Sequence, residues 1–100
     1  MIHLTQLIYI KPGQEAAFDA FEAVALPLIA RYNGQLLLRV RPEPKALIEG
    51  EESLPYEIHL VSFPTEEDFL AFGKDPGRAA ALPLKEASVD RILLIKGIAL

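Results

Sequence analysis

The sequence consists of two halves that follow nearly the same pattern. In the first half, an apolar run at Ile2–Ile10 is followed by a proline, a pair of phenylalanines three residues apart and the segment Ala-Leu-Pro-Leu. In the second half, the apolar run Tyr56–Phe63 is followed by the same three features in the same order. Each half also contains a further strand candidate after its helical segment. The repeat therefore predicts the order β-α-β twice within 100 residues.

Periodicity gives the extent of the individual elements. Period-two alternation predicts four strands, at residues 2–10, 35–41, 56–63 and 89–98. Apolar residues at three- and four-residue steps predict one helix over residues 14–32, with Pro27 inside it and Asn33-Gly34 as its stop. A second helical region begins at the capping residue Thr65, stops at Gly73 and restarts at Asp75-Pro76.

The segment between the second and third predicted strands is different in composition. Residues 42–55 are polar and acidic and contain several prolines. We interpret them as an excursion or mobile loop, with a short strand extension at Ala46–Ile48. The acidic residues of this segment lack the Asp/Asn spacing of a calcium-binding loop and are interpreted as solvated.

The predicted fold is the ferredoxin-like β-α-β-β-α-β plait of the α+β class. A single domain over residues 1–100 accounts for the length. The four strands form an antiparallel-type sheet, and both helical regions cover the same face of it. The other face has no cover within the chain, although it carries apolar residues. We therefore expect a homodimer through this helix-free face, which is a dimeric α/β barrel with a shared cavity.

Composition excludes several functional classes. The formal charge of −4 and the pI of about 5.1 argue against nucleic acid as a partner. The absence of cysteine excludes disulfides and thiolate chemistry. No apolar run approaches the roughly 20 residues of a membrane span, and no signal peptide is visible, so we expect a cytoplasmic protein without membrane contact.

Several short motifs, in this order and spacing, resemble a bacterial family of uncharacterised small proteins, the DUF1330 group. These motifs are Pro27, Tyr32-Asn33-Gly34, Leu37-Leu38-Arg39, Glu49-Gly50, Phe63-Pro64-Thr65 and Asp75-Pro76 with the alanines and leucines that follow. Family members often carry a tryptophan directly after Glu-Gly, whereas Glu51 follows here. The resemblance implies a homodimer with a cavity between two sheets. It implies no reaction, although related families of this superfamily include cofactor-independent monooxygenases, haem-degrading enzymes and isomerases.

Strand alternation selects the residues that would line such a cavity. The more uniformly apolar side of each strand should face the helices. The opposite side then carries the candidate substrate-binding residues, which are His3, Thr5, Tyr9, Arg39 and Ser62.

Each of these candidates has a structural as well as a functional interpretation. His3 is a general base, a haem ligand or a histidine at the rim of the interface. Tyr9 orients a ligand or packs at the interface. The guanidinium group of Arg39 requires a carboxylate, which is either a protein group such as Glu49 or a ligand.

The two histidines do not predict a metal site. We take the first and third strands to be parallel neighbours, which separates His3 from His59 by about 13 Å along the strands at ~3.3 Å per residue. Alternation also places them on opposite faces. Glu57 and His59 share a face and form either a carboxylate–imidazole unit or a histidine bonded to its neighbour. We predict no metal and no cofactor.

No complete catalytic motif is present in the sequence. The first hypothesis is a homodimer of unassigned biochemical function that binds a small anionic or phenolic molecule on the open sheet face. The alternative is a cofactor-independent enzyme of the monooxygenase or isomerase type, in which His3, Tyr9 and Arg39 hold and polarise the substrate. The sequence leaves the choice between these hypotheses open.

Overall fold

A computed structural model describes residues 1–100 and contains four strands and three helices. The elements in chain order are β1 (Ile2–Ile10), α1 (Glu15–Arg31), β2 (Gln35–Val40), β3 (Glu57–Phe63), α2 (Glu66–Gly73), α3 (Pro76–Ser88) and β4 (Val89–Gly97). The predicted β-α-β-β-α-β order is confirmed, with the second helical region divided into α2 and α3 as the Gly73 and Asp75-Pro76 signals indicated.

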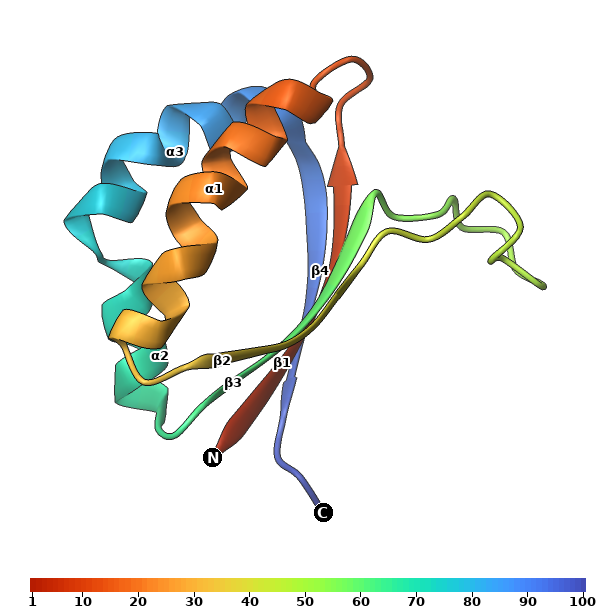
Figure 1. Cartoon of the computed structure of the whole chain (residues 1–100). Helices are drawn as coiled ribbons and strands as arrows, with labels where there is room; N and C mark the ends of the chain where they lie inside the picture. Colours follow the sequence, from red (N-terminus) through yellow and green to blue (C-terminus); the bar gives the residue numbers. More distant parts are fainter.

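The molecule has two layers, a sheet and a helical layer that covers one of its faces (Figure 1). The strand order is β2-β3-β1-β4, and every neighbouring pair is antiparallel. The antiparallel sheet is therefore as predicted. The prediction that β1 and β3 are parallel neighbours is wrong, because they are antiparallel neighbours. His3 pairs with Ser62, and His59 pairs with Gln6. The two histidines still point to opposite faces, because three residues separate Ser62 from His59 along β3.

The helix ends follow the expected capping chemistry. The Thr65 hydroxyl accepts a hydrogen bond from the backbone N–H of Asp68 at 3.1 Å. The Asp75 carboxylate accepts from the N–H groups of Gly77 and Arg78 at 2.7 and 3.1 Å, and Pro76 occupies the first turn of α3. Asn33 has a φ of 65°, which ends α1 in the left-handed conformation that asparagine tolerates.

The core lies between the sheet and the helices. Its buried side chains come from one side of each element: Leu4, Ile8, Val61 and Phe63 from the sheet, Phe18, Phe21, Ala25 and Ile29 from α1, and Ala81 from α3. The phases predicted for β1 and β3 are therefore confirmed, since Leu4 and Val61 face the helices and His3 and Ser62 face away from them.

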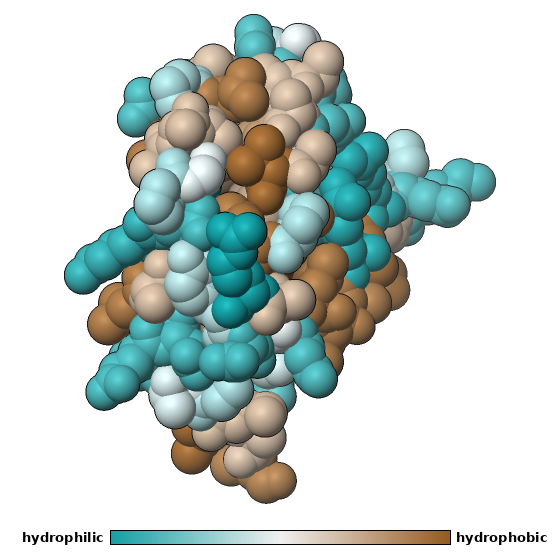
Figure 2. All heavy atoms as spheres, turned by 60° about the vertical axis from the view of Figure 1, so that its left-hand side comes forward, coloured by the Kyte–Doolittle hydropathy of each residue, from teal (hydrophilic) through white to brown (hydrophobic).

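The open face of the sheet carries large apolar side chains that no element of the chain covers. They share the strand phase of His3 and are Leu7, Leu38, Val40, Ile58, Leu60, Leu93 and Ile95. Several of them are about half exposed, such as Leu93 at 48% and Ile95 at 53%. Figure 2 shows the helical side of the molecule, where hydrophilic and hydrophobic side chains are interspersed.

The excursion between β2 and β3 extends away from the body of the molecule, on the side opposite the helices (Figure 1). The predicted strand extension at Ala46–Ile48 is wrong, because these three residues belong to no strand. Ile48 is almost fully exposed at 97%. No helix of the chain is both long enough and apolar enough to cross a bilayer.

Strand β2 contains a bulge that changes which side of it faces the helices. Leu36 pairs with Val61 and Leu38 pairs with Leu60, so Leu37 has no partner on β3. Alternation is inverted beyond this point, and Arg39 pairs with His59 on the helix-facing side. The predicted position of Arg39 on the open face is therefore wrong.

Candidate functional site: a buried Glu–Glu–His cluster

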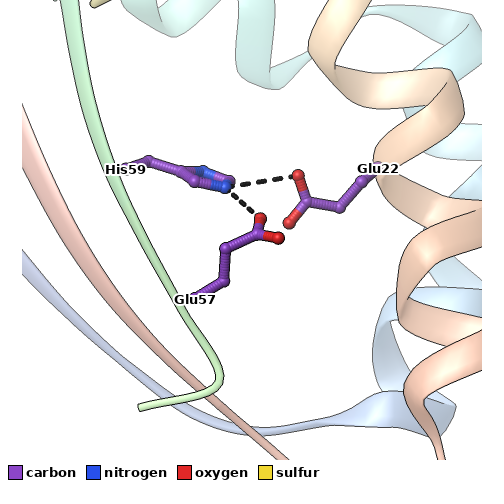
Figure 3. A group of neighbouring side chains, drawn as sticks. All are labelled: Glu22, Glu57 and His59. Atoms are coloured by element: carbon purple, nitrogen blue, oxygen red, sulfur yellow. Dashed lines mark hydrogen bonds and ion pairs between the residues drawn. The ribbon is translucent and has the colours of Figure 1, made fainter. Parts of the chain in front are cut away.

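The helix-facing side of the sheet carries a buried group of three ionisable side chains (Figure 3). Glu57 and His59 lie two residues apart on β3, and alternation therefore directs both toward α1. Glu22 reaches them from the middle of α1. Their exposed fractions are 0% for Glu57, 3% for His59 and 3% for Glu22. Charged groups this deeply buried are rare unless they are paired or functional.

Two arginines, Arg39 of β2 and Arg41 directly after its end, bind the carboxylate of Glu57. Nε of Arg39 lies 3.1 Å from Oε2 of Glu57, and Nε of Arg41 donates to Oε1 at 2.9 Å. Arg41 also donates to Asp19 of α1 at 2.8 Å through Nη2. Both guanidinium groups are partly exposed, so the bulge after Leu36 places them at the rim of the cluster. Glu57, and not the predicted Glu49, is the main carboxylate partner of Arg39, with Glu22 4.0 Å away.

One ring nitrogen of His59 faces both carboxyl groups (Figure 3). Its Nε2 makes a close contact with Oε2 of Glu57, and the same nitrogen is 3.3 Å from Oε2 of Glu22. A single ring nitrogen carries at most one proton, so it can donate fully to only one of these oxygens. Glu57 is the closer partner. Both oxygens of Glu22 are buried and lack a hydrogen bond.

The surroundings of Glu22 favour its neutral form. Burial raises the pKa of Glu22 from 4.5 to about 9, and the neighbouring carboxylate of Glu57 acts in the same direction. The charges of Arg39 and Arg41 oppose this shift only in part. At neutral pH, Glu22 is therefore a protonated carboxylic acid that can donate a hydrogen bond.

Glu57 is shifted in the opposite direction. Burial alone would raise its pKa, but the hydrogen bonds from His59, Arg39 and Arg41, together with the neighbouring carboxyl group of Glu22, outweigh burial and lower the pKa of Glu57 below its ordinary value. Two carboxyl groups in one site thus have pKa values that are pushed apart. This is the arrangement by which proteins keep one acid protonated next to an ionised one.

Glu22 and His59 also form part of the wall of a cavity between the helices and the sheet. The cavity has a volume of about 70 Å³. This is several times the ~10–15 Å³ that one water molecule needs. Most of the lining is apolar, and the polar side chains in the wall are Gln6, Glu22, His59, Arg78 and Lys85. An apolar cavity with a few convergent polar groups is typical of a small-molecule site.

The same three side chains offer ligand atoms that a metal ion could use. One atom each from Glu22, Glu57 and His59 lies within 4.8 Å of the others. The two guanidinium groups that already bind Glu57 place positive charge beside any cation at this position, which opposes its binding. The protonated state of Glu22 also removes one anionic ligand. The donor set therefore favours acid–base chemistry over metal binding.

The substrate-binding residues predicted from the sequence lie on both faces of the sheet, with Arg39 alone on the helix-facing side. His3, Thr5, Tyr9 and Ser62 lie on the open face, as their strand phases predicted. They do not form one compact group, since His3 and Ser62 are directly opposite each other whereas Tyr9 lies near the other end of β1. The ligand-binding roles of these four residues stay predictions.

Tyr9 packs against a neighbouring strand. The guanidinium carbon of Arg91 lies 4.0 Å from the centre of the Tyr9 ring, and Arg91 is paired with Glu52 at 2.7 Å.

Sequence reasoning identified the Glu57–His59 pair but missed Glu22. The available signal was position: Glu22 follows Phe18 by four residues and precedes Ala25 by three, which places a carboxyl group within the apolar stripe of α1.

Solved structures with the same fold show low sequence identity to this chain. A protein of unknown function from Rhodopseudomonas palustris is 20% identical, with a TM-score of 0.83 over 99% of this chain and 82% of the other. A dimeric ferredoxin-like protein of unknown function from Jannaschia is 16% identical, with a TM-score of 0.72 over 98% of both chains. A NIPSNAP domain protein from Burkholderia xenovorans is 11% identical, with a TM-score of 0.70 over 100% of this chain and 95% of the other.

These likenesses establish the ferredoxin-like fold and do not identify an activity. No protein of curated function matches the sequence. The family model described as a domain of unknown function, DUF1330, matches residues 7–98. Because this match spans most of the chain and agrees with the motifs found in the sequence, the chain belongs to the DUF1330 family.

Proposed function

We propose that this protein binds a small organic molecule in the cavity between the helices and the sheet, with Glu22 donating a hydrogen bond to an oxygen of the ligand. The observation that carries the proposal is the state of Glu22. Its carboxyl group is 3% exposed, has no hydrogen-bond partner for either oxygen and forms part of the cavity wall. An unmet buried donor costs about 1–3 kcal/mol, and a ligand oxygen that accepts a hydrogen bond from this carboxyl group would recover this cost.

The cavity indicates the size and character of this ligand. Its mostly apolar wall favours a compact hydrocarbon body, and its volume of about 70 Å³ limits the ligand to a small molecule. The neutral carboxyl group of Glu22 favours an acceptor such as a carbonyl or phenolic oxygen. A ligand of this kind agrees with the phenolic class predicted from the sequence, although the site lies on the other side of the sheet.

We propose further that the protein is a homodimer through the open face of the sheet. The uncovered apolar side chains of that face support this assembly, as do structural relatives from Jannaschia and Bacteroides fragilis that are described as dimeric. His3, Thr5, Tyr9 and Ser62 would then be enclosed between two sheets. Nδ1 of His3 is already buried without a partner, so the space between the sheets is the alternative position for a ligand.

A second candidate function is proton transfer to the bound molecule. The opposed pKa shifts of Glu22 and Glu57 favour it, because a carboxyl group that keeps its proton at neutral pH can act as a general acid. His59 touches both groups and can pass a proton between them. Such a reaction moves a proton within the substrate and requires no cofactor. It is of the isomerase-like class predicted from the sequence, although that alternative used His3, Tyr9 and Arg39 on the open face.

Binding of acetone, monitored by ¹H–¹⁵N NMR, tests the proposal, with 2-methylpropene as a probe of nearly the same shape in which a methylene group replaces the carbonyl oxygen. We expect acetone to shift the amide signals of cavity-lining residues on α1 and β3. The variant Glu22→Leu keeps a side chain of similar size and removes the donor. It should weaken binding of acetone by about tenfold, as expected for one buried hydrogen bond, and leave binding of 2-methylpropene unchanged.

The pattern of shifted signals separates the possible outcomes. Equal effects of Glu22→Leu on both probes would contradict the role of Glu22. Shifts confined to the amides of His3, Thr5 and Ser62 would place the ligand between the sheets instead.

Size-exclusion chromatography with light scattering tests the proposed dimer. The variant Leu60→Asp, which places a charge on the open face, should yield a monomer. A wild-type monomer would contradict the proposed assembly.

A further inference from the structure

Two cationic side chains in the cavity wall have no anionic partner. Arg78 and Lys85 both come from α3 and both line the cavity that Glu22 and His59 also line. They are seven residues apart, which is close to two helical turns, so they lie on the same face of α3. Neither residue forms an ion pair, although every other arginine of the chain does.

The guanidinium group of Arg78 is held in place without neutralisation. It stacks over the rings of Phe21 and Phe72, with its central carbon 5.7 and 5.4 Å from their centres. One of its terminal nitrogens donates to the carbonyl oxygen of Gly73 at 3.4 Å, while its Nε is buried and has no partner. The two rings fix the orientation of the guanidinium plane and leave at least one donor free.

Lys85 is similar in its lack of partners. It is half-buried, and its ammonium group has no hydrogen bond to the protein. Burial lowers the pKa of Lys85, and the charge of Arg78 lowers it further, so the two cations lie close enough to repel each other. Burial also lowers the pKa of Arg78. An anion between them would relieve the repulsion and replace lost solvation.

From this arrangement we infer that the ligand of the cavity is an organic anion, a small carboxylic acid in its ionised form, whose carboxylate binds Arg78 and Lys85. This inference rests on the proposed function, because it describes the same cavity. Glu22 does not repel such an anion, since it is protonated. Glu57 is neutralised by Arg39 and Arg41. The cavity thus presents two free cations, an apolar wall and one neutral acid, which suits a carboxylate with an apolar body and a second oxygen.

Binding of propionate tests the inference, with propionamide as a neutral probe of nearly the same shape. We expect the wild-type protein to bind the carboxylate at least about tenfold more tightly than the amide in calorimetry, as expected for charge-assisted hydrogen bonds. Lys85→Met keeps the apolar part of the side chain and should remove most of this preference. Arg78→Gln should do the same, and Lys74→Gln is the control, because it removes an exposed charge outside the cavity wall.

The outcomes distinguish this inference from the proposal on which it rests. Equal affinity for carboxylate and amide, or a preference that survives Lys85→Met, would overturn the anion site and leave the neutral ligand in place. Failure of both probes and of acetone to bind would overturn both the anion site and the proposed function. Because Arg78 packs between two phenylalanines, its substitution can also lower stability. Lys85→Met, whose fold is checked by circular dichroism, therefore gives the decisive comparison.

Discussion

Replacing Glu22 with glutamine keeps the shape of the neutral carboxyl group and removes its titration. Because the pKa of Glu22 is raised from 4.5 to about 9 on folding, the unfolded chain loses this proton at a lower pH than the folded chain does. Between these two pKa values, each pH unit lowers the free energy of unfolding by about 1.4 kcal/mol. Below this window both states are protonated, and the contribution of Glu22 is fully present.

At pH 7, the free energy of unfolding of the wild-type protein is therefore about 3 kcal/mol lower than it would be with a permanently neutral side chain at this position. We expect Glu22→Gln to increase the free energy of unfolding at pH 7 by roughly 2–3 kcal/mol, allowing for incomplete hydrogen bonding of the new amide. The gain should grow as the pH rises toward 9 and disappear below 4.5. A buried acid that costs stability in this way is typical of a residue kept for function.

Urea unfolding at about pH 5 and about pH 8, at one protein concentration, measures this effect directly. Glu86→Gln is the matched control, because Glu86 is exposed on α3 and should show the same pH dependence as the wild type. The reasoning would be refuted if Glu22→Gln kept the wild-type decline in stability between these pH values. It would also be refuted if the variant were less stable than the wild type at the higher pH.

Three other perturbations test separate parts of the structure. Tyr32→Phe removes the hydrogen bond that the hydroxyl donates to the buried Asp75 at 2.6 Å, and should lower the free energy of unfolding by about 1–2 kcal/mol. An unchanged urea midpoint would contradict this contact. Gly34→Ala places a methyl group 2.6 Å from the ring of Phe63, and should cost about 1–3 kcal/mol; a neutral effect on the melting temperature would show that the ring can move away. Zinc ions in excess should leave the melting temperature unchanged, because two guanidinium groups already occupy Glu57, and stabilisation by zinc would favour a metal site.

Local signals in the sequence were sufficient for the elements of this fold. The cap at Thr65, the Asp75-Pro76 start and the Asn33-Gly34 stop each act within a few residues, so they can be recognised without knowing what packs against them. The phases of β1 and β3 were also predictable, because one side of each strand is more apolar than the other.

Long-range features account for what the sequence did not reveal. The unpaired Leu37 inverts the alternation of β2, and nothing in the apolar run around it marks the bulge, so Arg39 was assigned to the wrong face. Its true partner, Glu57, is close only because β2 and β3 pair. Glu22 was detectable as a charged residue within an apolar stripe, but its partners on the sheet depend on how α1 packs. The cluster is thus a product of tertiary packing and not of a sequence motif.

The protonation state of Glu22 is the central claim, and it can be observed by ¹³C NMR of the side-chain carboxyl carbons as a function of pH. The signal of Glu22 is assigned by its absence in Glu22→Gln. The structure predicts a carboxyl signal that stays in the protonated range at neutral pH and titrates near 9. A Glu22 signal that titrates near the ordinary value of 4.5 would show that the group is an ionised carboxylate, and it would contradict the proposed acid in the cavity.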